Sequence, residues 1–356
     1  MPRERSCAFA PGRVNLIGEH TDYNQGLALP FAIDEGVTVL AEAYGAASGG
    51  EARIEAHASD LGESDEFALA HPPGADGWRA FVRGVVAELS RDGFPLVGAR
   101  LQISGGLPFG AGLSSSAALE VALCLALADL GSRALPGEAR VVERTDIARL
   151  CQRVENDWVG AHTGLLDQLA SLYGAPDSAL CIDFSTLQID SVPLRLDGWR
   201  LVLLDSGERH VHASSGYNER RAECAEACRL MGVESLRQAG AEATERLPEP
   251  LRRRAGHVRG ENERVRLAVA ALRADDLMAV GALLDASHVS LRDNYEVSTP
   301  AVEVAVERLR EAGASGARLV GGGFGGSVLG LFAPDVFYPD GAREVRPGAG
   351  ANLLAP

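Results

Sequence analysis

The chain has 356 residues, of which 46% are hydrophobic and 23% charged, as in folded globular proteins, and its length predicts two domains. The formal net charge of -15 repels nucleic acid and anionic membranes, which argues against both as general partners, and a site for a polyanion must be locally positive. All 34 residues counted as Lys or Arg are arginines, which excludes a P-loop lysine and a Schiff-base lysine.

The compartment is predicted from the cysteines and from the N-terminus. Six cysteines are scattered along the chain without a CxxC pair, as in proteins of a reducing compartment. The sequence shows neither an N-terminal secretory signal nor an apolar run that would span a bilayer. We therefore expect a cytoplasmic protein, and we expect it to be a monomer.

Hydrophobic periodicity predicts both strands and helices in the first half of the chain. The expected strands are residues 6–17, 36–44 and 100–104, and the expected helices are residues 78–89, 115–130, 147–158 and one that begins near residue 165. Gly131 is expected to stop the second of these helices, which should be buried because it is apolar on nearly every side. Residues 46–76 are rich in Gly, Asp, Glu, Ser and Pro, so we expect turns at an exposed edge there.

The second half is predicted to contain helices over residues 217–231, 259–273 and 300–312, and then a strand over residues 328–332. Strand-like segments replace helices between residues 174 and 199, which favours a domain boundary there.

A glycine-rich loop leads into the apolar helix. Residues 105–112 read GGLPFGAG, and Ser114, Ser115 and Ser116 follow where the helix begins. Backbone N–H groups of such a loop and the positive end of the helix dipole bind phosphate, and the serine hydroxyls can cap the helix or face phosphate and Mg²⁺. The loop matches neither GxxxxGK[ST] nor GxGxxG. An arbitrary Gly/Ser loop is better interpreted as a flexible turn with a serine cap, but the length of this loop and its three serines shift the balance toward phosphate binding.

A polar cluster near the N-terminus has the properties of a sugar site. Residues 10–26 read APGRVNLIGEHTDYNQG, and Glu19, His20 and Asp22 offer the acceptors and the imidazole that recognition of sugar hydroxyls needs. Apolar residues that need burial interleave with the polar ones, which argues against a solvated turn.

Three motifs of the chain resemble those of the galactokinases, a branch of the GHMP kinase family. Residues 10–26 are similar to the galactokinase sugar signature, residues 106–118 to the family's phosphate-binding motif, and residues 316–326, GARLVGGGFGG, to its C-terminal glycine motif. The resemblance implies an α+β, two-domain GHMP kinase fold with the active site in the cleft between the domains. Residues 1–180 would form the N-terminal domain and residues 181–356 the ferredoxin-like C-terminal domain.

The implied activity is ATP-dependent phosphorylation of the C1 hydroxyl of galactose, the first phosphorylation step of galactose catabolism, with ATP as co-substrate and Mg²⁺ as metal. The resemblance implies that Asp167 and Arg13 are catalytic, and that Ser116 and Glu155 bind Mg²⁺. It implies a sugar site made by Glu19, His20, Asp22, Gly164 and Tyr217. It implies an ATP site made by Trp78, Gly110, Gly112, Leu113, Ser114, Ser115, Ser116, Ala117, Gly322 and Gly323. Whether Asp167 is a true base or an electrostatic group stays open.

Some positions depart from the family pattern, and two alternatives remain. Thr163 stands where the family usually has Cys, and Val320 where it usually has Thr. A sister kinase for arabinose, galacturonate or GalNAc would keep the fold and change the sugar. A non-catalytic sensor of sugar and ATP is disfavoured, because the serine motif and Asp167 are intact.

Overall fold

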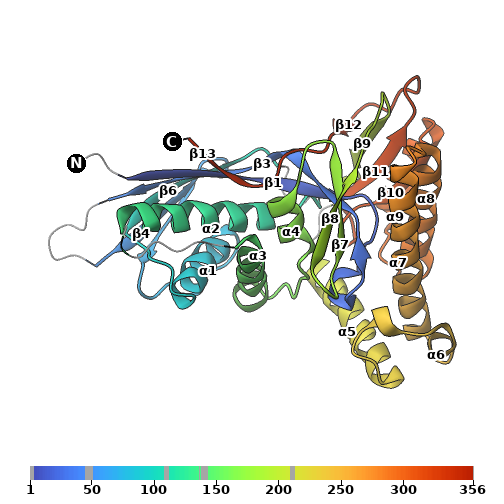
Figure 1. Cartoon of the computed structure of the whole chain (residues 1–356), viewed down its shortest axis with the longest axis horizontal. Helices are drawn as coiled ribbons and strands as arrows, with labels where there is room; N and C mark the ends of the chain where they lie inside the picture. Colours follow the sequence, from blue (N-terminus) through green and yellow to red (C-terminus); the bar gives the residue numbers. More distant parts are fainter. Residues whose placement is uncertain are drawn as a thin grey trace.

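A six-stranded sheet forms the N-terminal part of the molecule (Figure 1). The computed structural model describes residues 4–44, 51–107, 112–135, 137, 143–208 and 213–355. The strand order is β13-β1-β3-β6-β4-β5. The bounds are β1 Arg5–Asn15, β3 Pro30–Ala43, β4 Arg53–Ala58, β5 Glu63–Ala68, β6 Ala99–Gly105 and β13 Asn352–Leu354.

The pairing of β1 with β3 is interrupted where β1 approaches the phosphate loop. The antiparallel register shifts between Pro11 and Arg13, as at a β-bulge. A bulge bends the strand and re-aims the side chain next to it. Gly12 fits there because a Cβ at this position would lie 2.7 Å from the Leu113 carbonyl oxygen. The irregularity therefore brings the backbone of β1 against the start of α2 and aims Arg13.

One face of this sheet is covered by helices α1 Trp78–Arg91, α2 Ser115–Ala134, α3 Arg144–Arg153 and α4 Leu166–Tyr173 (Figure 1). A π-helical turn, Val154–Val159, extends α3. The prediction that Gly131 stops α2 is wrong, since the helix continues to Ala134. A Cβ at Gly131 would lie 1.7 Å from the Pro95 carbonyl oxygen, so the glycine permits close packing inside the helix.

Helix α2 is, among the described residues, the one helix long and apolar enough to cross a membrane by length and composition. However, 72% of its apolar window is buried inside the protein, as in the core helix of a globular domain. It packs against β1 and β3 on one side and against α1, α3 and α4 on the others. The prediction of a buried central helix is confirmed.

The C-terminal part contains a four-stranded sheet of order β10-β11-β9-β12. Its strands are β9 Arg200–Asp205, β10 Gly316–Leu319, β11 Ser327–Phe332 and β12 Arg343–Val345. The helices are α5 Ala213–Met231, α6 Ala241–Glu245, α7 Leu251–Arg273, α8 Leu277–Asp293 and α9 Pro300–Glu311. A small sheet of β2 Leu27–Ala28, β7 Ser178–Asp183 and β8 Gln188–Pro193 lies between the two parts (Figure 1).

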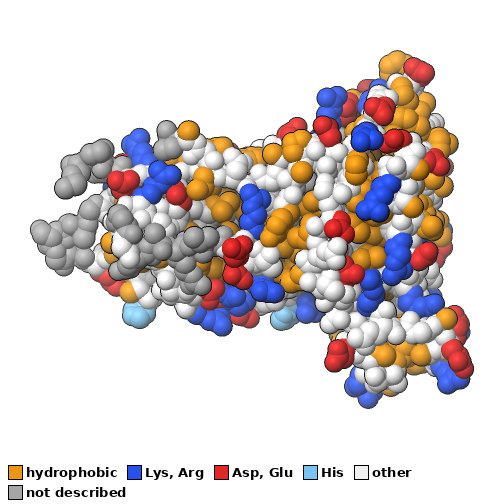
Figure 2. Space-filling model, in the orientation of Figure 1, with side chains coloured by type: hydrophobic (Ala, Val, Ile, Leu, Met, Phe, Trp, Pro, Cys, Tyr) orange, Lys and Arg blue, Asp and Glu red, His pale blue; other side chains and the backbone are white. Residues whose placement is uncertain are grey.

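Several elements differ from the sequence prediction. Residues 46–76 were expected to form turns, but they contain the hairpin of β4 and β5, and β4 pairs in parallel with β6. Helix α8 was not predicted. Over the visible C-terminal surface, acidic and basic side chains are interspersed (Figure 2). Exposed ion pairs in this part of the chain include Arg229–Glu226 on α5.

One hydrophobic core contains side chains from both the N-terminal and the C-terminal part of the chain. Val14, Leu16, Ile17 and Leu29 pack in the same cluster as side chains from β9, α7 and α8. The polar loop of residues 18–26 is therefore held between the N-terminal sheet and the C-terminal helices. The domain boundary at residue 180 stays a prediction. This core shows that the segment of residues 10–26, which resembles the sugar signature, packs against both parts of the fold.

Candidate active site

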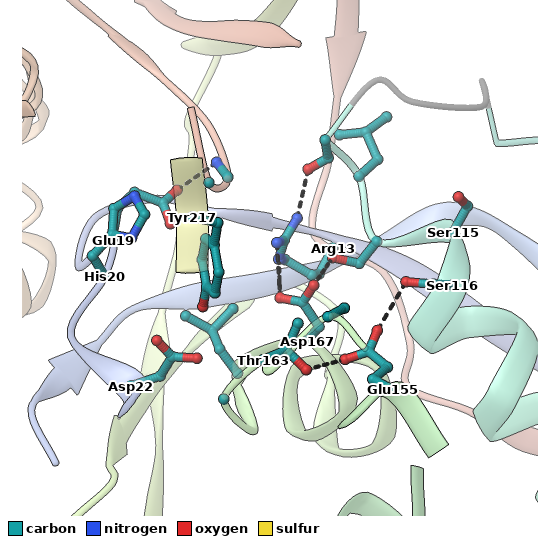
Figure 3. Close-up of a pocket in the computed structure, with 18 of the residues that line it drawn as sticks. Arg13, Glu19, His20, Asp22, Ser115, Ser116, Glu155, Thr163, Asp167 and Tyr217 are labelled. Atoms are coloured by element: carbon teal, nitrogen blue, oxygen red, sulfur yellow. Dashed lines mark hydrogen bonds and ion pairs between the residues drawn. The ribbon is translucent and has the colours of Figure 1, made fainter. Parts of the chain in front are cut away.

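A pocket of about 350 Å³ lies where the two parts of the fold meet. Its walls come from β1 and the loop after it, the start of α2, the segment from the π-helical turn to α4, the helix α5, and the glycine run after β10 (Figure 3). The predicted residues that line it are Arg13, Glu19, His20, Asp22, Gly112, Leu113, Ser114, Ser115, Ser116, Glu155, Gly164, Asp167, Tyr217, Gly322 and Gly323.

Arg13 and Asp167 meet on one side of this pocket. The Arg13 Nε donates to Asp167 Oδ1 at 2.9 Å, and Nη2 of the same arginine lies 2.7 Å from that oxygen. The third guanidinium nitrogen, Nη1, donates to the Gly112 carbonyl at 2.6 Å. Because all three guanidinium nitrogens have a partner, the orientation of the Arg13 side chain is fixed. Arg13 therefore links the Asp167 carboxylate to the glycine-rich loop that precedes α2.

Ser114 and Ser116 bond carboxylates rather than the helix backbone, and the contact of Ser116 with Glu155 is drawn in Figure 3. Ser114 is the N-cap residue in a left-handed conformation with φ 59°, and its hydroxyl donates to Asp167 Oδ2 instead of capping α2. The Ser116 hydroxyl donates to Glu155 Oε1 at 3.1 Å. Within the described part of the chain the N-cap residue makes no side-chain cap to α2, and N–H groups at such a helix start bind anions.

Glu155 lies in the π-helical turn, buried among polar partners. Its Oε2 accepts from the Thr163 hydroxyl and, at 3.0 Å, from Gln168 Nε2. Burial raises the pKa of Glu155, and the negative charge of Asp167 raises it further. Beneath it on α2, Glu120 is fully buried, and burial together with the charge of Glu155 holds its pKa well above the usual range.

The opposite side of the pocket has the composition of a sugar site. Glu19 is 4% exposed, and its Oε1 accepts from the backbone N–H of Gly321 at 2.8 Å. Burial raises the pKa of Asp22 to about 7, with a further contribution from Asp167 across the pocket. Gly164 packs so closely on Asp22 that a Cβ there would lie 1.8 Å from Oδ2.

His20 and Tyr217 complete this side. Their ring centroids lie 5.4 Å apart. Burial lowers the pKa of His20 to about 3, and nearby His257 and Arg220 lower it further. A Cβ at Gly322 would lie 3.1 Å from the Tyr217 ring, so the glycine run forms the wall behind this tyrosine.

Three predicted ATP-site residues are not among those that line this pocket. The Trp78 indole N–H donates to Glu63 Oε2 at 2.9 Å. Ala117 is buried in the first turn of α2. Gly110 lies outside the described residues.

Sequence reasoning missed several residues that build the site. Gln168 supports Glu155, and Arg318 on β10 lies 3.2 Å from Glu19 Oε1. Phe81, from α1, also lines the pocket. The signal for Arg318 is an arginine in an otherwise apolar strand next to the glycine run, where burial requires a carboxylate partner.

Three segments match known family descriptions. Residues 2–43 match the galactokinase galactose-binding signature, residues 80–175 the GHMP kinases N terminal domain, and residues 268–346 the GHMP kinases C terminal. The galactokinase of Mycobacterium tuberculosis is 44% identical over 92% of this chain and 88% of its own. That of Thermotoga petrophila is 40% identical over 92% of this chain and 89% of its own. This chain belongs to the galactokinases.

Solved structures agree with this membership of the galactokinases. The crystal structure of Lactococcus lactis galactokinase complexed with galactose superposes with a TM-score of 0.87 at 33% identity, covering 99% of this chain and 95% of that one. A mevalonate kinase superposes with a TM-score of 0.66 at 18% identity and shares the fold alone. The predicted α+β GHMP kinase fold is confirmed.

Proposed function

We propose that this galactokinase-family protein transfers the γ-phosphate of ATP to the C1 hydroxyl of α-D-galactose, giving galactose 1-phosphate and ADP. The observation that carries this is the meeting of Arg13 and Asp167 in one pocket, between the start of α2 and the polar loop of residues 18–26. Phosphoryl transfer demands mainly alignment and charge stabilisation, and this pocket has a binding surface of the right chemistry on each side.

The start of α2 is proposed to hold the phosphates. Backbone N–H groups of residues 112–117 and the helix dipole attract anions, and Ser115 lines the same pocket. Arg13 then supplies the positive charge at the transferred phosphate, in a chain that has no lysine. Gly322 and Gly323 of the glycine run line the same pocket and are proposed to contact ATP.

Ser116 and Glu155 suit Mg²⁺. Hydroxyl and carboxylate oxygens are hard ligands, and Mg²⁺ in kinases takes one or two from the protein and the rest from phosphates and water. Among the described residues no group of three or more His, Cys, Asp or Glu could form a metal cage, which fits that mode. When bound, the ion would neutralise charge on the β- and γ-phosphates. Thr163 and Gln168 orient the Glu155 carboxylate toward this role.

Asp167 is proposed to meet the C1 hydroxyl of the sugar. Both of its oxygens accept hydrogen bonds from the protein, Oδ1 from Arg13 and Oδ2 from Ser114. These contacts orient the carboxylate so that it can receive the hydroxyl proton or stabilise the developing charge. Glu19, His20, Asp22, Tyr217 and the closely packed Gly164 are proposed to contact the remaining hydroxyls.

A substrate panel tests the proposal. Purified protein with Mg²⁺ and ATP is given galactose, glucose, GalNAc, arabinose or galacturonate, and ADP formation and the sugar phosphate are measured. Turnover with galactose well above the other sugars, with galactose 1-phosphate as product, is expected. Turnover with another sugar alone would move the substrate to a sister kinase. A folded protein that binds ATP and turns over no sugar would make the sensor alternative correct.

We also propose that the protein acts in the cytoplasm as a monomer. All six cysteines are free thiols, which supports a reducing compartment. Light scattering coupled to gel filtration tests the oligomeric state, and a mass of twice 37.4 kDa would contradict it.

A further inference from the structure

A line of hydrogen-bonding side chains leads from the sugar side of the pocket into the C-terminal core. His20 Nδ1 lies 2.9 Å from the Tyr23 hydroxyl, which lies 2.9 Å from the Tyr295 hydroxyl, which lies 3.1 Å from Cys224 Sγ. Tyr295 is 0% and Cys224 2% exposed. Two side chains distant in sequence, Tyr295 and Cys224, therefore connect through Tyr23 to one ring nitrogen of the pocket histidine.

The other ring nitrogen is unpaired. His20 Nε2 is buried and has no hydrogen-bond partner among the described residues. The ring cannot turn freely, because its centroid lies 4.6 Å from that of Tyr295 and 5.4 Å from that of Tyr217. The backbone of His20 is also held in the left-handed region, with φ 62°.

The imidazole is neutral, so its two nitrogens differ. Burial lowers the pKa of His20 to about 3, and burial raises the pKa values of Tyr23 and Tyr295 well above their usual range. Both phenols therefore keep their protons. A neutral imidazole has one donor and one acceptor nitrogen, and the partner of one nitrogen decides the tautomer.

The chemistry of the line favours one direction of donation. If Cys224 donates to Tyr295, Tyr295 to Tyr23 and Tyr23 to Nδ1 of His20, each phenol proton lies on an oxygen or a nitrogen acceptor. The reverse direction would leave the Tyr295 proton on a thiol sulfur, which is a weak acceptor. In the favoured direction Nδ1 accepts, so the ring proton lies on Nε2.

We infer that the Cys224–Tyr295–Tyr23 line fixes His20 as the Nε2–H tautomer and makes it a hydrogen-bond donor in the sugar site. Tyr23 and Tyr295 are then positioning residues for sugar recognition. The Glu19 carboxylate in the same pocket only accepts hydrogen bonds, so His20 supplies the complementary donor for a hydroxyl that must accept. An unpaired buried donor is costly, and a sugar oxygen would relieve that cost. The part that concerns the sugar rests on the proposed galactokinase function, whereas the tautomer does not.

The test begins with ¹⁵N NMR of the histidine rings of the full chain without sugar, with the His20 signals assigned by their loss in His20→Gln. The expected spectrum shows a protonated Nε2 and an unprotonated Nδ1. Tyr23→Phe removes the donor to Nδ1, and Tyr295→Phe removes the next link, so both should shift His20 toward a mixture of tautomers. Tyr173→Phe is the matched control, because its hydroxyl bonds Thr145 Oγ1 at 2.8 Å outside this line.

Galactose affinity of the same variants is measured by calorimetry. Tyr23→Phe and Tyr295→Phe should weaken binding by about 5-fold or more, the net worth of one hydrogen bond, while Tyr173→Phe leaves it unchanged. A protonated Nδ1 in the unaltered protein would overturn the inference. It would also be overturned if both Tyr23→Phe and Tyr295→Phe left the tautomer and the galactose affinity unchanged. If the tautomer is as expected but the protein binds no galactose, the role of the Cys224–Tyr295–Tyr23 line in fixing the tautomer is supported and the proposed function is wrong.

Discussion

Arg13 and Asp167 lie 154 positions apart in the chain, yet Arg13 Nη2 approaches Asp167 Oδ1 to 2.7 Å. The arginine side chain is 7% exposed and the aspartate 28%, so the pair is shielded on the protein side and open toward the pocket. Because Arg13 also binds the Gly112 carbonyl, the carboxylate has a fixed place relative to the start of α2. This contact joins the sugar side of the site to its phosphate side.

Asp167→Asn should abolish turnover while galactose binding is largely kept. The amide has nearly the same shape, but it can neither accept a proton nor balance the Arg13 charge. A base is worth about 10²–10⁴-fold in rate, so kcat should fall by at least about 10²-fold. Steady-state kinetics and calorimetry with galactose measure the two effects separately. Loss of binding along with activity would mean that Asp167 is mainly structural.

Galactose binding should weaken as the pH falls through neutrality, because the pKa of Asp22 is raised to about 7. If only the carboxylate form binds, affinity at pH 6 is about 10-fold below that at pH 8. Asp22→Asn should remove this dependence, whereas Glu63→Gln, on the exposed β5, should keep it. A flat profile in the unaltered protein would show that Asp22 does not titrate in this range.

The same group affects stability in the opposite direction. Folded Asp22 keeps its proton to a higher pH than the unfolded chain does, so its contribution is present below the usual aspartate pKa and is lost as the pH rises through about 7. Binding and stability therefore draw on different protonation states of one carboxyl group.

Part of the site could be predicted from the residues themselves because they lie in short, locally dense motifs, whereas Asp167, Glu155 and Tyr217 were predicted only through the resemblance to the galactokinases. The glycines and serines at the start of α2 indicate phosphate binding, and the polar residues of the segment 10–26 indicate sugar recognition, before any contact is known. The contact of Arg318 with Glu19 could not be predicted, since the partners are far apart in sequence and only β10 packing against the N-terminal loop joins them.

The errors in the fold have similar physical causes. Local propensity predicted that Gly131 ends α2. In the structure the glycine lies inside the helix, where its missing side chain lets α2 pack against the Pro95 carbonyl. The hairpin of β4 and β5 was hidden by polar composition, although Ile54, Ala56 and Ala58 alternate with more exposed neighbours along β4 as in a half-buried strand.

Gly164→Ala should damage sugar recognition out of proportion to its size. The added methyl would lie 1.8 Å from Asp22 Oδ2, so either Asp22 or the loop before α4 must move. Displacements of about 1 Å at reacting groups cost up to about 10²-fold, and kcat/KM for galactose should fall by that order. The matched control is Gly256→Ala on α7, where a Cβ meets nothing within 4 Å. Equal activity of the two variants would contradict the close-packing argument.

Arg318→Met should destabilise the fold and leave Glu19 misplaced. Arg318 is fully buried, donates to the carbonyls of Asn15 and Leu16 at 2.8 and 2.9 Å, and neutralises Glu19. Breaking a buried pair costs about 3–5 kcal/mol in the free energy of unfolding, because one charge is left uncompensated. The control is Arg100→Met: its pair with Glu55 is 57% and 40% exposed.

Such an exposed pair contributes about 1 kcal/mol at most. Urea unfolding of both variants gives the comparison, and adding Glu19→Gln to Arg318→Met should recover part of the loss. A loss in Arg318→Met no larger than that in Arg100→Met would show that the buried pair contributes nothing specific.

Glu120→Gln should stabilise the protein at neutral and alkaline pH. Both Glu120 carboxylate oxygens lack a hydrogen-bond partner among the described residues, and burial with the nearby Glu155 charge raises the pKa well above 4.5. The folded state binds a proton that the unfolded state releases, so the free energy of unfolding falls as the pH rises above about 4.5. Glutamine mimics the protonated acid and escapes this loss.

Glu88→Gln on α1 is the matched control for this prediction. Glu88 is 5% exposed, but Arg91 and Arg153 both pair with it, so replacing it should cost stability. Urea unfolding of both variants between pH 5 and 9, about the range in which the two signs separate, should show Glu120→Gln gaining on the unaltered protein with pH while Glu88→Gln stays below it. If Glu120→Gln is destabilised as much as Glu88→Gln at pH 8, then Glu120 is ionised and paired in the folded protein. That outcome would contradict the prediction that buried Glu120 keeps its proton.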